Sequence, residues 1–128
     1  MAAPVLRIDP ASPAPIVRQI VDQLRVPLVE GSLRPGTVLP PVRRLATDLA
    51  VHFNTVAEAY RQLASEGWLD LRQGRGATVV EREAPAPSRR ELSGYRQRLR
   101  ELVSQMRAHG VPSSRIAAEL KAIAEGIE

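Results

Sequence analysis

Apolar residues recur at helical spacing near the start of the chain, and this pattern predicts a first helix over residues 13–30. Pro15 suits the first turn of such a helix, whereas Pro27 lies inside the apolar stripe and should bend the helix or move its end. Gly31 is a suitable residue to end it. The stripe consists of Ile16, Val17, Ile20, Leu24 and Leu28.

Two shorter stripes follow and predict a second and a third helix. The second begins after the Leu-Pro-Pro run at residues 39–41, and a break at residues 50–51 separates it from a third that starts around residues 52–54. Gly67 ends the third helix, and we expect Trp68 to be the main aromatic residue of the core. The predicted buried positions are Val42, Leu45, Ala46 and Leu49 on the second helix and Val56, Ala59, Tyr60 and Leu63 on the third.

The pattern changes to short strand-like runs after the third helix. Residues 68–72 and 77–80 predict two strands, and the glycines between them support a hairpin. A further short strand is predicted at residues 5–8. Three helices and a hairpin, with a four-residue gap between helices two and three, predict a winged helix-turn-helix. The predicted fold class is therefore mainly α with a small β-wing.

A charged linker with prolines, at residues 83–89, divides the chain. The part before it, residues 1–82, holds the predicted winged helix-turn-helix. The part after it, residues 90–128, predicts an α-helical hairpin whose last helix can be capped by Ser113 or Ser114.

This helical hairpin carries a regular apolar face on each helix. Along residues 90–109 the apolar positions are spaced 3-4-3-4, which is typical of a heptad seam. Two helices could pair only with each other, but each would then leave an apolar stripe in water. Sharing the stripes with a second copy is the favoured alternative, so we expect a homodimer. The seam consists of Leu92, Tyr95, Leu99, Leu102 and Met106, and the face of the last helix of Ile116, Leu120, Ile123 and Ile127.

Composition excludes several classes of protein. The 128 residues include no cysteine, which excludes a disulfide framework and a thiolate metal site, and two histidines cannot make a structural zinc site by themselves. No apolar run approaches the roughly 20 residues that span a bilayer, and the N-terminus lacks the pattern of a signal peptide. No catalytic constellation or P-loop is present in the sequence. We therefore expect a cytoplasmic protein that is not an enzyme and uses no metal or cofactor.

The chain is basic, but its charge is spread along it. Lys and Arg number 18 against 14 Asp and Glu, for a net charge of +4. Residues 1–82 hold ten arginines and eight acids, and residues 83–128 hold eight basic residues and six acids, so each part carries +2. A basic chain fits a polyanionic partner, but net charge alone does not establish one, so the prediction depends on where particular arginines lie. Arg75, between two glycines at the hairpin tip, can reach a phosphate or a narrow minor groove, or can simply be solvated.

The segment LRPGTVLPPVRRLATDLAVHFNTVAEAYRQLASEGWLDLRQGRGATVV, at residues 33–80, resembles the DNA-binding domain of GntR-family bacterial transcriptional regulators. The motifs that carry the resemblance are LRPG, LP-x-x-R-x-LA, NTV-x-x-AY-x-x-L, EGW and G-x-G-x-x-V. The two-helix C-terminal region resembles the YtrA subfamily. The resemblance implies a sequence-specific DNA-binding regulator, expected to be a repressor that binds a two-fold-related operator as a dimer.

The resemblance also places DNA contacts on the second helix, the start of the third helix and the wing. Asn can read adenine, Arg can read guanine, and Thr can reach a phosphate or a thymine methyl. The amino end of the third helix offers free N–H groups and a positive dipole end to a phosphate. Arg61 could touch the DNA backbone or pair with Glu58. The candidate residues are Arg43, His52, Phe53, Asn54, Thr55, Arg61, Gln73, Gly74 and Arg75.

Four positions depart from the family pattern. Pro41 stands where a serine is usual and removes a side-chain cap, and Ala50 stands for a glycine, at a cost of about 1 kcal/mol if the positive φ is kept. Phe53 and Ala57 replace arginines of relatives and so remove base-reading cations. Phe53 could lie against a thymine methyl or pack back on the first helix, and packing is slightly favoured.

Two classes of function remain open at this stage. A DNA-binding regulator is favoured, and a winged-helix adaptor that binds proteins without touching DNA is the alternative. A small-molecule effector is not expected in the C-terminal region, because two helices should enclose too little volume for a ligand pocket.

Overall fold

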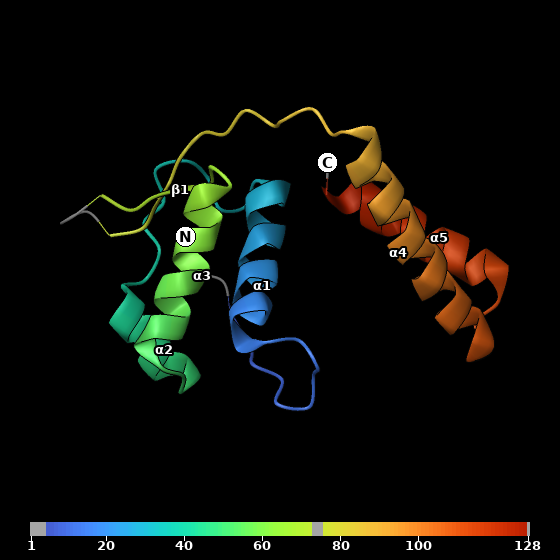
Figure 1. Cartoon of the computed structure of the whole chain (residues 1–128), viewed down its shortest axis with the longest axis horizontal. Coiled ribbons are helices and arrows are strands. Elements are labelled where there is room, and N and C mark those ends of the chain that lie inside the picture. The colour runs from blue at the N-terminus through green and yellow to red at the C-terminus, as the bar shows by residue number, and fades with distance from the viewer. Residues whose placement is uncertain (1–4, 73–75, 128) are drawn as a thin grey trace. The chain divides into compact units, whose positions relative to one another are not determined.

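The computed structural model describes residues 5–72 and 76–127 (Figure 1). It divides into two compact units, Met1–Arg82 and Glu83–Glu128, and each unit is described by itself. Within the described residues, the N-terminal unit contains three helices and a small sheet, and the C-terminal unit, called the tail below, contains two helices.

Helix α1, Ile16–Glu30, begins three residues later than the predicted start at residue 13. Pro15 has ψ 152° and is the N-cap, so it lies just outside the helix and not in its first turn as predicted. The helix continues through Pro27 and ends at Gly31, which has φ 86° and donates its N–H to the Pro27 carbonyl at 3.1 Å. The predicted role of Gly31 is therefore confirmed.

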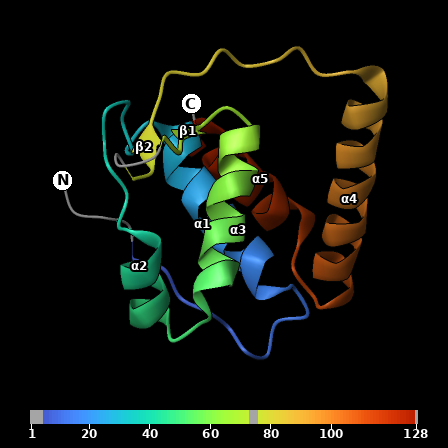
Figure 2. The ribbon, with the colours of Figure 1, turned by 60° about the vertical axis from the view of Figure 1, so that its left-hand side comes forward.

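Helices α2 (Val42–Leu49) and α3 (Phe53–Ser65) follow, joined by a three-residue connection. Figure 2 shows this connection between the end of α2 and the first turn of α3. Gly67, with φ 92°, comes directly after the C-cap of α3 and donates its N–H to the Ala64 carbonyl at 3.0 Å. A glycine in the left-handed region thus ends α3, as predicted, and turns the chain into the sheet.

The two strands form an antiparallel pair, as predicted, but they are short. Strand β1, Leu69–Asp70, pairs with β2, Thr78–Val79. Both strands are shorter than the predicted ranges, residues 68–72 and 77–80. An apolar run indicates a strand, but it does not show how many of its residues hydrogen-bond to the neighbouring strand.

A third segment, residues 36–39, joins the sheet on the other side of β2, where the sequence indicated only a turn followed by the approach to α2. The Gly36 N–H donates to the Val79 carbonyl at 2.7 Å, and the Val79 N–H donates to the Thr37 carbonyl at 2.8 Å. This pairing anchors the wing to the loop that leads into α2.

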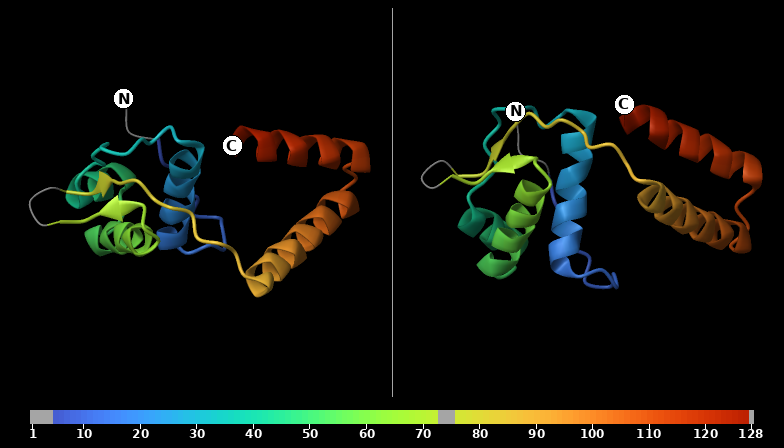
Figure 3. Two further views of the ribbon diagram at one scale, coloured as in Figure 1. Left: turned by 90° about the horizontal axis from the view of Figure 1, so that it is seen from above. Right: turned by 45° about the horizontal axis from the view of Figure 1, so that its top comes forward.

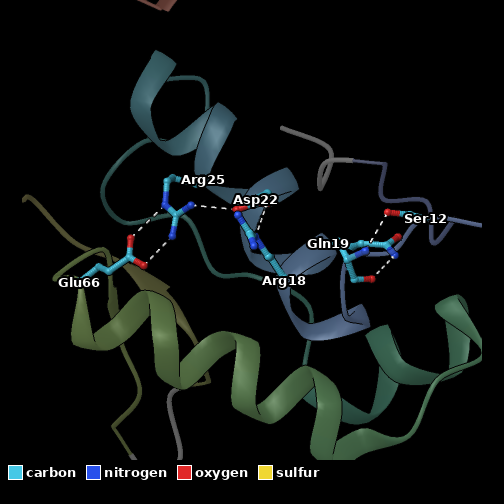
Figure 4. Close-up of polar contacts among 7 residues, drawn as sticks. Ser12, Arg18, Gln19, Asp22, Arg25 and Glu66 are labelled. Atoms are coloured by element: carbon cyan, nitrogen blue, oxygen red, sulfur yellow. Dashed lines mark hydrogen bonds and ion pairs between the residues drawn. The ribbon is translucent and has the colours of Figure 1, made fainter. Parts of the chain in front are cut away.

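The strand predicted at residues 5–8 is extended chain without strand pairing, so that prediction was wrong. Its hydrogen bonds run to side chains of α1 instead. Gln23 accepts from the Arg7 N–H at 2.9 Å and donates to the Arg7 carbonyl at 2.6 Å, and Gln19 accepts from the Asp9 N–H at 2.8 Å. Figure 4 shows the Gln19 side chain turned toward the segment that carries Ser12. Two glutamine amides therefore take the place of a neighbouring strand.

The apolar faces of the three helices meet the wing in one core. Tyr60, 2% exposed, is its largest buried side chain, whereas Trp68 is only partly buried and has the Arg82 guanidinium 4.4 Å from its ring centre. Tyr60 and not Trp68 is therefore the main aromatic residue of the core. The buried residues are Ile20, Val21, Leu24, Leu28, Leu33, Leu39, Leu45, Ala46, Val56, Ala59, Tyr60, Leu63, Leu69, Ala77 and Val79.

Arg25 ties α1 to the end of α3 (Figure 4). Its Nη2 lies 2.6 Å from Glu66 Oε2 and its Nε lies 3.0 Å from Glu66 Oε1, while Nη1 contacts Asp22 at 3.0 Å. The hydrogen bond to Glu66 raises the pKa of Arg25. Both partners stay about one-third exposed, so water screens the pair and its contribution to stability is modest.

In the tail, helix α4 spans Arg89–Ala108 and is capped by Ser88, whose Oγ accepts from the Glu91 N–H at 3.1 Å. Figure 3 shows α4 and the last helix spreading apart from the turn that joins them. None of the helices in the described ranges is long and apolar enough to cross a membrane.

The last helix, α5, spans Ser113–Ile127. The Pro112 carbonyl accepts from the N–H groups of Arg115 and Ile116 at 3.0 and 3.1 Å. Ser113 and Ser114 therefore already lie inside the helix, and the prediction that one of them caps it was wrong.

Candidate nucleic-acid interface

The first turn of α3 is organised by the residue that precedes it. His52 is the N-cap, and its Nδ1 accepts from the Asn54 N–H at 3.1 Å, while its carbonyl accepts from the Thr55 N–H at 3.0 Å. Two of the amide groups expected to be free for a phosphate are thus already hydrogen-bonded inside the protein. The cap leaves the Asn54 side chain exposed and that of Thr55 half-buried.

The connection between α2 and α3 contains a backbone conformation that glycine normally supplies. Ala50 has φ 56° and ψ 43°, the one positive φ among the non-glycine residues that the structure describes. The left-handed region brings Cβ close to the backbone and costs about 1–2 kcal/mol. The predicted strain at Ala50 is therefore present, and the core on both sides of the turn holds it in place.

Phe53 stands 46% exposed at the start of α3, so its ring is not buried against α1, the alternative that the sequence slightly favoured. Its ring stacks on the His52 ring, with centroids 4.9 Å apart and an interplanar angle of 25°. The Arg43 guanidinium, from α2, lies 5.8 Å from the Phe53 ring centre. These three side chains border an open hollow of about 480 Å³, which is lined by Arg43, Ala46, Thr47, Ala50, Val51, His52 and Phe53.

A buried hydroxyl fixes how α2 enters this surface. Tyr60 Oη donates to the Pro40 carbonyl at 2.7 Å, just before the Pro41 N-cap of α2, which has no side-chain cap. Burial raises the pKa of Tyr60, because ionisation would place a charge in the core. The sequence marked Tyr60 as core but gave no signal for this hydrogen bond.

Within the described residues, two of the cations without an ion pair lie on helices α2 and α3. In the described part of the N-terminal unit, Arg18, Arg25 and Arg72 form ion pairs, whereas Arg43 and Arg61 are exposed without one. The alternative that Arg61 pairs with Glu58 is therefore wrong.

The wing is described only in part. Gln73, Gly74 and Arg75, the predicted contacts at its tip, lie outside the described residues. At the base, Arg72 Nε lies 3.1 Å from Asp70 Oδ2, so the arginine that precedes the tip is paired within the protein.

This arrangement combines a helix-turn-helix, an exposed first turn of the third helix and a wing, and comparison with known proteins identifies the family. The family model described as "Bacterial regulatory proteins, gntR family" matches residues 16–79, half of the chain. The chain belongs to the gntR family.

Two relatives of known kind match nearly the whole gntR-family chain. The HTH-type transcriptional repressor YtrA of Bacillus subtilis is 30% identical over 97% of this chain and 95% of its own length. A crystal structure described as a transcriptional antiterminator from Listeria monocytogenes has a TM-score of 0.76 and 25% identity over 98% of this chain and 94% of that one.

One further neighbour contains DNA. The DNA-binding domain of AraR in complex with operator ORX1 has a TM-score of 0.53 and 26% identity, over 62% of this chain and 99% of that one. The similarity is therefore to a winged-helix domain, and the solved complex shows that domain of AraR with its operator.

The tail of this gntR-family chain carries the residues predicted for dimerisation, and most of them face solvent. Leu92, Tyr95, Leu99 and Leu102 are each at least half exposed, as is Ile123. Of the side chains that the structure describes in the tail, Ile116 alone is buried, at 4% exposed. Of the remaining two, Met106 is half-buried and Leu120 is just over one-third exposed.

An open groove of about 690 Å³ lies between α4 and α5, beside their turn. The groove is open rather than enclosed, so the expectation that two helices enclose too little volume for a small-molecule effector stays a prediction. The groove is lined by Leu102, Met106, His109, Gly110, Val111, Pro112, Arg115, Glu119, Leu120 and Ile123. Within the described ranges, no three His, Asp or Glu side chains are grouped so as to hold a metal ion.

Proposed function

We propose that this chain is a transcriptional repressor that binds operator DNA through the start of α3, through Arg43 and through the wing. One observation carries the proposal. The capped end of α3 exposes Phe53 and Asn54, whereas the opposite face of α3 is core. The Arg43 guanidinium of α2, which has no ion pair in the described structure, lies next to the Phe53 ring. The B. subtilis relative is named a repressor and the AraR domain is solved on an operator, which supports both parts of the proposal. Such a regulator acts in the cytoplasm, where bacterial DNA lies.

Each exposed group suits one kind of contact in the major groove. The Asn54 amide can bond both N6 and N7 of an adenine, and Thr55 can reach a phosphate. Arg43 can bind a phosphate or a guanine, because its guanidinium is not engaged by an acid in the described structure. Arg61 lies about two turns further along α3, where a contact to the DNA backbone is the natural role.

The tail supports a dimer on a two-fold-related operator. A single winged helix has few phosphate contacts and should bind weakly. Joining two copies through the seam makes the second half-site contact intramolecular, with an effective concentration that can reach about millimolar. The half-sites should then lie about one helical turn apart.

Occupancy of the tail groove by the second copy is favoured over a small effector. Leu102, Met106, Leu120 and Ile123 line the groove and also belong to the two faces predicted for dimerisation. The same second copy would therefore cover the groove and the exposed seam together.

The experiment is a titration of duplex DNA carrying the promoter of the protein's own gene, at several salt concentrations. Binding that neutralises Z phosphates gives a log–log slope of about −0.9Z. Arg43→Gln should reduce the magnitude of the slope by about 1 for each bound copy. Arg18→Gln is the matched control, because Arg18 is paired with Asp22 on α1 and should leave the slope unchanged. A slope near zero would instead favour the protein-binding adaptor.

A further inference from the structure

An exposed phenylalanine at the first position of α3 is costly unless something covers it. Full burial of such a side chain is worth roughly 1.5–3 kcal/mol, and Phe53 forgoes much of this because 46% of it lies in water. Phe53 belongs neither to the core cluster nor to the residues packed against it. Its recorded ring partners are His52 and Arg43.

The ring is also held in one place. His52 stacks on Phe53 at 4.9 Å, and His52 is itself fixed by its hydrogen bond to the Asn54 N–H at 3.1 Å. The cap therefore orients the histidine, and the histidine supports the phenylalanine. A supported aromatic side chain loses little conformational entropy when a partner covers it.

From this geometry we infer that Phe53 contacts the C5 methyl group of a thymine and so selects that base in the operator. The inference rests on the proposed DNA-binding function and names one base contact within it. In the major groove the thymine methyl is the apolar feature of the base edges, and phenylalanine is among the side chains that contact it. Phe53 carries no hydrogen-bonding side-chain group, so it cannot read any of the polar positions.

The neighbours of Phe53 restrict where that thymine lies. Asn54 is the next residue on the helix, about 100° around the axis, and suits an adenine. The Arg43 guanidinium lies 5.8 Å from the centre of the Phe53 ring and suits a phosphate or a guanine. The selected thymine should therefore lie within a base pair of the position that Asn54 reads, in each half-site.

The test removes one methyl group at a time from the DNA. A duplex pool with a randomised central region is selected with the full-length protein, and each thymine of the enriched half-site is then replaced by deoxyuridine. This change deletes the C5 methyl and keeps every hydrogen-bonding group. At one thymine per half-site, the dissociation constant should rise about fourfold, as expected for one buried methyl-sized group.

Protein variants separate this contact from a general loss of binding. Phe53→Ala should bind thymine and deoxyuridine duplexes equally, whereas Asn54→Ala should bind both more weakly and keep the fourfold difference. Phe53→Leu, which retains an apolar side chain, should keep part of the difference in affinity between the thymine and deoxyuridine duplexes. Thermal unfolding of each variant checks that the exposed substitution leaves the fold intact.

The outcomes distinguish the inference from the function on which it rests. Equal affinity of the wild-type protein for every thymine and deoxyuridine duplex would overturn the assignment of Phe53 and leave DNA binding standing. A deoxyuridine effect that persists unchanged in Phe53→Ala would overturn it as well. If no duplex is enriched and none binds, the proposed DNA-binding function fails too.

Discussion

The N-terminal unit and the tail are built from apolar stripes of similar regularity, yet they bury them to very different extents. On α1, α2 and α3 the stripes meet one another and the wing, so that Ile20, Val56 and Leu63 have no exposed surface. On α4 an equally regular seam leaves Leu99 half exposed, and Ile116 is the buried residue of the described tail.

The difference shows what a stripe does and does not specify. Helical spacing predicts that a helix has an apolar face, but the number of neighbouring elements decides whether one chain can cover that face. Three helices and a wing enclose a core. Two helices cover only one side of each other, which is why we propose that a second copy covers the rest of the tail.

The largest expected effect separates the two units by their stability. Leu63→Ala should lower the free energy of unfolding of the N-terminal unit by about 2–5 kcal/mol, because it opens a cavity in a fully buried site. Leu99→Ala should leave that transition unchanged. Urea unfolding followed by the fluorescence of Trp68, the one tryptophan of the chain, reports this unit directly. Equal shifts in both variants would mean that the units do not unfold independently.

The next effect separates the units by their association. The fragment of residues 1–83 should be a folded monomer that keeps its helix content, because every residue of the core cluster lies within it. It should lose at least tenfold in affinity for a two-half-site duplex, as it lacks the intramolecular second contact. Sedimentation of both chains, with a DNA titration of each, checks the prediction.

A matched pair of substitutions tests the same point in the full-length chain. Leu99→Lys places a charge in the seam and should dissociate the dimer. Gln97→Lys adds the same charge on an exposed position where Gln97 already contacts Glu101, and should leave the dimer intact. A dimeric fragment, or a Leu99→Lys variant that stays dimeric, would assign the tail another task.

The smallest effect concerns how each unit makes a left-handed turn. The connection between α2 and α3 holds Ala50 at φ 56°, whereas the connection between α4 and α5 holds Gly110 at φ 89°. Ala50→Gly should therefore raise the free energy of unfolding by about 1 kcal/mol, and Gly110→Ala should reduce the helicity of the tail. Thermal unfolding and circular dichroism measure the two changes. No gain from Ala50→Gly would show that the turn relaxes without strain.

Much of the fold could be predicted because it depends on local patterns. The stripes located five helices, and glycines located the ends of α1 and α3. One error arose where side chains replaced a backbone partner. Gln19 and Gln23 hydrogen-bond to the backbone of the segment predicted as a strand. The spacing of apolar residues does not indicate which glutamines make such bonds.

The candidate site divides in the same way. The family resemblance was enough to place Asn54 at the start of α3, where its side chain is exposed. The cap by His52, the bond from Tyr60 to the Pro40 carbonyl and the exposure of Phe53 each depend on a contact between particular atoms. Such contacts are set by the packed structure, so the sequence predicted the wrong environment for Phe53.

The half-exposed seam of α4 has a consequence for the amount of protein a cell must hold. If the operator takes two copies joined at this seam, dimers are scarce when the chain is dilute, and their number then follows the square of the chain concentration. A twofold fall in the chain would reduce the dimers about fourfold in that regime. Dilution at cell growth or a small change in synthesis would thus be amplified into a steep release of the regulated promoter, without any ligand.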